Sequence, residues 1–180
     1  SCFTDEYQDV CQKQKIEDLR FAKGVTHFLR NGGVVYDMLK IYFDEIFRHK
    51  TSEQLEHIKE MLMAVNVHIA ASSLTSAGFA LAVASTVSIG LNMSLEISAL
   101  AGRGAGTTVG FVAIYGVLQK AVDSAYRLKI TYPAYHAALY AQELEMMYFL
   151  IEPVFLRAGA LDAKWASDTA IAETIMRMVR

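Results

Sequence analysis

The centre of this chain carries almost no charge. Residues 61–101 contain one formally charged side chain, Glu96, and residues 104–119 contain none. Arg103 stands alone between the two runs, and His68 is the other group in the first run that titrates near neutral pH. A helix at a protein surface normally has a charged or polar face. The centre must therefore be covered by the rest of the chain, by a partner or by lipid.

The composition predicts helices on both sides of this centre. The chain has 180 residues, 53% of them hydrophobic, and only two prolines. No segment shows the sustained alternation of a strand. We predict an all-α fold of about seven helices, in which amphipathic helices wrap around a central uncharged helical hairpin. We expect residues 1–180 to form one domain, with amphipathic helices in 1–60, the apolar hairpin in 61–122 and C-terminal helices in 123–180.

Local signals place the helix borders in the first third. Asn31 and the two glycines that follow it end a first helix, whose apolar stripe is Leu19, Ala22, Val25, Phe28 and Leu29. A second helix is predicted over 34–49, with Val35, Met38, Leu39, Tyr42, Phe43 and Ile46 on its apolar side. Thr51 and Gln54 have the spacing of a capping box and start a third helix. Its stripe continues through Leu55, Ile58, Leu62, Val65 and Ile69.

The C-terminal part has its own helix signals. Thr131 and Pro133 mark the start of a helix, which we predict to continue through residue 158 with a kink at Pro153. Gly159 is expected to end it, and Asp162 to cap a last helix that reaches the C-terminus. We expect packing, rather than a membrane interface, to explain the tyrosines of this part, and we expect Trp165 to be a core anchor.

Small residues recur at every fourth position of the uncharged centre. One series is Ser72, Ser76, Ala80, Ala84 and Ser88, and a second is Gly102, Gly106 and Gly110. Residues four apart share one face of a helix, so each series predicts a smooth groove that another backbone can approach closely. Membrane helices associate through such small residues because hydrophobic burial cannot drive their association.

Two interpretations of the centre stay open. It is either the buried core hairpin of a soluble bundle, or a hairpin that enters a membrane. The first arm of this hairpin is the nearly uncharged run 61–101, and the second arm is the run 104–119. Three features favour the membrane: small residues leave core volume unfilled, glycine costs about 1 kcal/mol of helix stability relative to alanine, and the second arm approaches the length of a span. We expect Gly106→Leu to abolish permeabilisation of membranes without unfolding the soluble form.

A helical bundle around an uncharged hairpin resembles the pore-forming domains of colicins. It is also similar to the colicin-like region proposed for apolipoprotein L proteins and to glycine-zipper hairpins of secreted bacterial effectors. The resemblance covers residues 61–122 and rests on architecture rather than on a motif. The chain departs from colicins in a less hydrophobic first arm and in the lack of a strongly basic surface.

The resemblance implies conditional insertion. The amphipathic helices shield the hairpin in water and then splay on a membrane surface. Glu96 and Arg103 then lie near the turn on the far side, and Ser72, Ser76, Ser88 and Thr86 line a pore. His68 is either a hydrogen-bonded core histidine or a pH trigger, since burial lowers the pKa of an imidazole and protonation would then open the bundle.

Other chemistries have weaker support. The stretch 102–110, GRGAGTTVG, lacks the third glycine of a dinucleotide fingerprint and the lysine of a P-loop. Glu45 with His49, and Glu53 with His57, have the spacing of metal ligands but alternate with basic residues, as on a solvated face. A net charge of −2 does not suit a nucleic-acid binder. We expect no enzymatic activity and no cofactor.

The expected partners are a lipid membrane, further copies of the chain and a shielding chaperone or immunity protein. The alternative function is a soluble all-α interaction module, such as an immunity, chaperone or adaptor protein, whose hairpin is buried core or an oligomer interface. The first function implies a chain that is secreted or delivered to a target membrane, and the second implies a cytoplasmic one. Cys2 and Cys11, if both lie on one helix, are about 13 Å apart, so their spacing favours free thiols unless Cys2 folds back.

Overall fold

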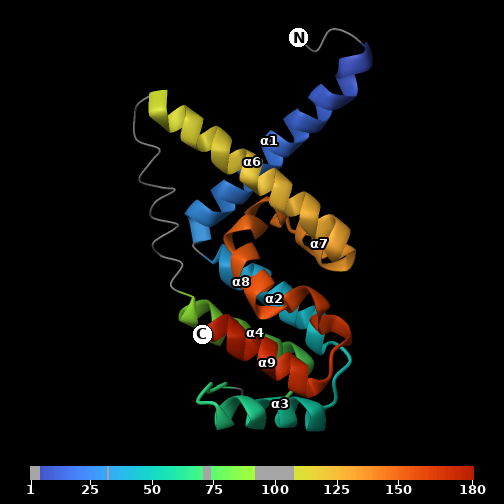
Figure 1. Ribbon diagram of the computed structural model, residues 1–180, viewed down its shortest axis with the longest axis vertical. Helices are drawn as coiled ribbons and strands as arrows, with labels where there is room; N and C mark the ends of the chain where they lie inside the picture. The colour runs from blue at the N-terminus through green and yellow to red at the C-terminus, as the bar shows by residue number, and fades with distance from the viewer. Residues whose placement is uncertain (1–4, 32, 71–73, 92–107) are drawn as a thin grey trace. The chain divides into compact units, whose positions relative to one another are not determined.

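The computed structural model describes residues 5–31, 33–70, 74–91 and 108–180 (Figure 1). These residues form eight α-helices and two short 3-10 helices, and they contain no strand. The predicted all-α class is confirmed, whereas the described helices outnumber the seven expected. The chain divides into two compact units: unit 1 comprises residues 1–34 and 102–149, and unit 2 comprises residues 35–101 and 150–180.

Unit 1 contains the first helix and the helices that follow the glycine-rich stretch. Its elements are α1 (Asp5–Asn31), α6 (Thr108–Thr131), α7 (Pro133–Ala141) and most of the 3-10 helix η1 (Glu145–Leu150). The helix α6 packs against α7 and is crossed by α1 (Figure 1). A row of buried tyrosines fills the core, with ring centroids 5.7 Å apart for Tyr132 and Tyr135 and 6.4 Å apart for Tyr135 and Tyr148.

Unit 2 contains the apolar first arm and the C-terminal helix. Its elements are α2 (Val34–Phe47), α3 (Ser52–Ala64), α4 (Ser76–Gly90), α8 (Glu152–Ala158), η2 (Ala160–Trp165) and α9 (Asp168–Val179). The helix α9 packs on α3, α4, α8 and η2, so it is the central element of this unit. The aromatic core combines Phe43 stacked on Phe47 at 5.7 Å with an edge-on contact of Phe47 and Phe79 at 4.9 Å.

Side-chain caps start three helices of unit 2, and a glycine ends a fourth. The capping box of Thr51 and Gln54 is present, as predicted. Thr75 caps α4 and Ser167 caps α9 by accepting a hydrogen bond from a backbone N–H in the first turn. Gly159 ends α8 with a left-handed φ of 68°, which confirms its predicted role.

Several predicted borders in the C-terminal part were wrong. Thr131 is the last residue of α6, and its hydroxyl donates to the carbonyl of Arg127, while Tyr132 occupies the cap before Pro133. The predicted helix over 131–158 is three elements, because Pro153 lies in the first turn of α8 rather than at a kink. Asp162 lies within η2 and does not cap the last helix.

Other expectations about burial and about one helix border were also wrong. Leu19 is 57% exposed rather than part of a packed stripe, and Trp165 is 89% exposed rather than a core anchor. The third helix ends at Ala64, so it does not carry Val65 and Ile69.

Cys11 is disulfide-bonded, so the free thiol expected there was wrong. That expectation placed both cysteines on one helix, whereas α1 begins at Asp5 and the second cysteine of the chain, Cys2, lies outside the described residues.

Candidate functional site

The helix α4 is uncharged on its buried side and on its exposed side. Its sequence, SAGFALAVASTVSIG, contains no charged residue. The buried side consists of Phe79, Ala80, Val83, Ala84 and Val87. The opposite side carries Ala77, Leu81, Ser85 and Ile89, all exposed and each four residues from the next. We call these four residues the outer stripe.

The buried side of α4 packs closely inside unit 2. The helix lies beside α9 and also contacts α3 (Figure 1). A Cβ atom added at Gly90 would lie 3.3 Å from Cγ1 of Val179, so the last turn of α4 approaches α9 very closely. Ala80 and Ala84 are completely buried. In this form of the chain, the two alanines of the small-residue series are therefore core residues.

The outer stripe differs from the exposed face of an ordinary amphipathic helix. Leu81 is 40% exposed and Ile89 is 83% exposed. Ser85 is the polar member of the stripe, and a helical serine can satisfy its hydroxyl at a backbone carbonyl one turn earlier. A helix without a charged face is normally buried in a core or in a membrane. The stripe is thus a surface suited to lipid or to an apolar partner.

The other residues predicted for the site are placed as follows. Ser76, Thr86 and Ser88 lie half-buried on α4, and the hydroxyl of Thr86 donates to the carbonyl of Ala82. Gly110 lies in the first turn of α6. Outside the described residues lie Ser72, Glu96, Gly102, Arg103 and Gly106. The pairing of Gly110 with the other two glycines of its series therefore stays a prediction.

His68 does not have the surroundings that a buried trigger needs. It is exposed, in a non-helical segment after α3, between the buried side chains of Val67 and Ile69. The apolar helix expected around it ends at Ala64. The expectation that His68 is buried, as a core histidine or as a trigger, was therefore wrong.

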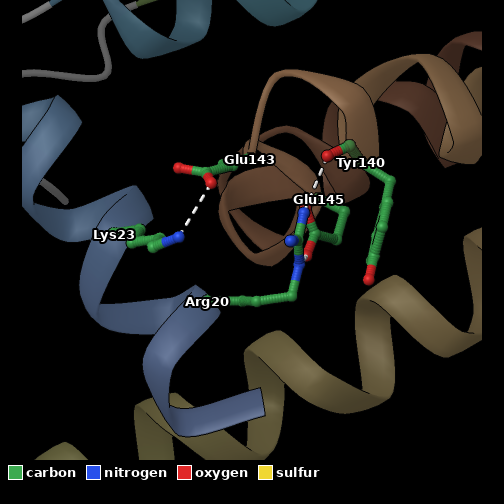
Figure 2. Close-up of polar contacts among 5 residues, drawn as sticks. All are labelled: Arg20, Lys23, Tyr140, Glu143 and Glu145. Atoms are coloured by element: carbon green, nitrogen blue, oxygen red, sulfur yellow. Dashed lines mark hydrogen bonds and ion pairs between the residues drawn. The ribbon is translucent and has the colours of Figure 1, made fainter. Parts of the chain in front are cut away.

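A second site, which the sequence analysis did not find, is a clamp between α1 and the α7–η1 corner in unit 1. The guanidinium of Arg20 donates to both carboxylate oxygens of Glu145, from Nε to Oε1 and from Nη2 to Oε2 at 3.0 Å. It also donates to the carbonyl of Tyr140 at 2.7 Å and lies 3.6 Å from the centroid of the Tyr140 ring (Figure 2). Glu145 is only 2% exposed. Such a two-pronged, sheltered pair is stronger and more specific than a surface pair.

Two neighbouring contacts complete the clamp. Lys23 on α1 donates to the carboxylate of Glu143 at 2.9 Å, and Glu143 lies in the turn that joins α7 to η1 (Figure 2). Glu143 has a left-handed φ of 59°, which is uncommon for a residue with a side chain. One turn after Arg20, Gly24 allows α1 to approach η1, since an added Cβ atom would lie 3.0 Å from Cγ and Cε of Met147. Arg20, Lys23 and Gly24 therefore fix α1 against this corner.

Electrostatic coupling extends from the clamp to His136 on α7. The hydrogen bond to Glu145 raises the pKa of Arg20 above its ordinary value, despite the opposing effect of burial. Burial lowers the pKa of His136, and the positive charges of Lys129 and Arg20 act in the same direction. Glu145 opposes that shift. His136 is therefore held towards its neutral form.

No sequence signal announces this clamp. Arg20 and Glu145 are 125 residues apart in the chain, and neither belongs to a motif. In the sequence, Glu145 is one charged residue among several near the C-terminal helices, and nothing there indicates that it is buried. Its partner depends on which helices pack together, and helix periodicity does not specify that.

The described residues contain neither a membrane-spanning helix nor a cluster of metal ligands. No helix there combines the length and apolar character that crossing a bilayer requires. No group of three or more His, Cys, Asp or Glu side chains is placed there to hold a metal ion.

The comparisons with known proteins give no family. No family model matches the chain, and neither do any curated protein or solved structure.

Proposed function

We propose that this is a membrane-active helical protein that inserts its apolar centre into a target membrane and forms pores there. The outer stripe of α4 carries this proposal. It presents Leu81 and Ile89 to solvent on a helix that has no charge on any face. The architectural resemblance to colicin-like and glycine-zipper hairpins points to the same function.

In the closed form, which is the form described above, the first arm belongs to unit 2, where α9 and α3 pack on one side of α4. Insertion exchanges these helices for lipid and for small-residue contacts with the second arm or with another copy of the chain. A bilayer span needs about 20 residues, so α4 must lengthen into its uncharged flanks, of which 65–70 and 74–75 are non-helical here. In the inserted form the two arms make the hairpin, and the remaining helices lie on the membrane surface.

The driving force is modest, which suits a conditional process. Leucine, isoleucine, phenylalanine and valine each favour insertion by only ~0.3–0.6 kcal/mol at the centre of a helix. Alanine and serine make up much of the rest of α4. The balance between the closed and inserted forms is therefore sensitive to contacts that hold the closed form together.

The disulfide at Cys11 supports a secreted or exported route. Disulfides form and persist in oxidising compartments and are rare in the cytosol. A chain that reaches a membrane from outside the producing cell passes through such a compartment. A cytoplasmic adaptor needs no such bond.

Release of dye and potassium from vesicles tests the proposal. Phosphatidylcholine vesicles with and without phosphatidylglycerol are treated with the full chain at about pH 7 and pH 5. Leu81→Glu and Ile89→Glu place a charge on the outer stripe, where it costs about 2.5–3.5 kcal/mol in the middle of a membrane helix. Both positions are exposed, so the soluble fold tolerates the change. We expect release to fall at least about tenfold.

Ile130→Glu is the matched control. Ile130 is 62% exposed on α6 and lies beside the charged residue Lys129, outside both uncharged runs. This variant should release dye like the wild type. A folded wild type that releases nothing under any of these conditions would overturn the membrane function, and the outer stripe would then favour the alternative, an interaction module.

A further inference from the structure

The helix α1 meets the rest of unit 1 in two places, where it crosses α6 and at the clamp. Val10, Ile16 and Leu19 are each more than half exposed. Among the α1 residues whose burial is described, Gly24 alone is buried. Arg20 and Gly24 both contact η1, through Glu145 and Met147. Weakening the clamp therefore removes the polar contacts that hold α1 against the α7–η1 corner.

His136 shares an aromatic ring with the clamp. Its imidazole stacks on Tyr140 with ring centroids 6.1 Å apart and an interplanar angle of 29°. The guanidinium of Arg20 lies against the same ring, 3.6 Å from its centroid. A positive charge on His136 would thus form beside an existing cation that contacts the same ring, and both charges interact with Glu145.

We propose that His136 is the pH sensor of this clamp, and that its protonation weakens the contact of Arg20 with Glu145 and releases α1 from the α7–η1 corner. The device belongs to unit 1 and does not depend on the membrane function.

The charges around the site explain the direction of the effect. They come from every element that meets here: Arg20 and Lys23 from α1, Lys129 from α6, Glu143 from the turn after α7, and Glu145 from η1. Three cations and two anions leave a net charge of +1 when His136 is neutral. An imidazolium raises it to +2, competes with Arg20 for Glu145, and is repelled by Arg20 and Lys129.

The shelter of the site strengthens this competition. Glu145 is 2% exposed and the side chain of Arg20 is 14% exposed, so water screens their contact poorly. Burial holds the pKa of His136 below its ordinary value of 6.5. A folded state that prefers the neutral imidazole is fully stable above that value and loses stability as the pH falls through the lowered pKa. The clamp is therefore closed at neutral pH and weakens under mild acid.

Hydrogen exchange of α1 amides measures the release. Exchange around Gly24 in the full chain is followed by mass spectrometry at about pH 7 and pH 5 and corrected for the intrinsic dependence of exchange on pH. We expect wild-type protection in α1 to fall about tenfold, as the weakening of one charge-assisted hydrogen bond would produce. His136→Phe keeps a ring against Tyr140 and cannot titrate, so its α1 protection should not depend on pH. His68→Phe, at an exposed histidine of unit 2, should behave like the wild type.

His136→Lys gives an independent test, because it fixes the positive charge. It should show at neutral pH the weak α1 protection that the wild type shows in acid, with the protection of α6 retained. The proposal is overturned if wild-type protection is independent of pH, if His136→Phe keeps the wild-type dependence, or if His136→Lys protects α1 as well as the wild type does.

Discussion

The two units hold their helices together in different ways. In unit 2, completely buried rings of Tyr42, Phe47 and Phe79 lie in the core, and Tyr42 adds a hydrogen bond from its hydroxyl to the carbonyl of Ala160 at 2.6 Å. In unit 1, a polar clamp and a glycine contact hold α1 against the α7–η1 corner. Apolar burial does not change with pH, whereas charged contacts do. Unit 2 is therefore expected to resist mild acid, and the attachment of α1 is expected to respond to it.

The largest effect is expected in the aromatic core of unit 2. Phe47 is completely buried between Phe43 and Phe79. Phe47→Ala should lower the free energy of unfolding by about 3–5 kcal/mol, because the ring is lost and a cavity remains. Tyr126→Ala removes a 59% exposed ring from α6 and should cost less than about 0.5 kcal/mol. Urea denaturation compares the two variants, and similar costs would contradict the assignment of the core.

The next effect separates two ion pairs on α1. Arg20→Met leaves the carboxylate of Glu145 buried without its partner, which should cost about 3 kcal/mol of α1 attachment. Lys23→Met breaks the pair with Glu143, in which the two side chains are 45% and 46% exposed, and should cost much less because water screens the pair. Hydrogen exchange of α1 measures both changes. Equal costs would mean that shelter from water does not distinguish these pairs.

A smaller effect compares two helical glycines. Gly24→Ala pushes a methyl group against Met147, and the overpacking should outweigh the gain in helix propensity by about 1 kcal/mol. Gly116→Ala adds a methyl group with no atom within 4 Å and should stabilise α6 by about 0.5–1 kcal/mol. Thermal denaturation and hydrogen exchange of each helix show whether each substitution stabilises or destabilises the protein. Stabilisation by Gly24→Ala would show that Met147 yields and that the close approach is dispensable.

The smallest effect concerns acid in unit 2. Burial raises the pKa of Asp44 on α2, although Lys40 and Arg48 oppose the shift. A folded carboxyl with a raised pKa stabilises the fold as the pH falls, which is opposite to His136 in unit 1. Asp44→Asn should therefore stabilise unit 2 by less than about 0.5 kcal/mol at neutral pH. The gain should vanish below the ordinary pKa of 3.8, and a gain that grows in acid would reverse the assigned sign.

Local signals in the sequence predicted part of this fold. The apolar stripe of the second helix, the capping box at Thr51 and the stop at Gly159 were all confirmed, because each depends on residues within a few positions of one another. Pro153 shows the limit: a proline suits a kink and a first helical turn equally well, and the choice depends on tertiary packing. The uncharged centre is evident in the sequence. The sequence does not show which side of α4 is covered by other helices.

The most direct test of the central claim asks whether the outer stripe of α4 enters lipid. Trp165 is the single tryptophan of the chain and is exposed, so Trp165→Phe provides a silent background. Ile89→Trp and, as control, Ile130→Trp are introduced into it and mixed with vesicles that contain lipids brominated in their acyl chains, which quench nearby indoles. We predict strong quenching at position 89 and little at position 130. An unquenched tryptophan at position 89 in a folded chain, under every condition of lipid and pH used for release, would contradict the account.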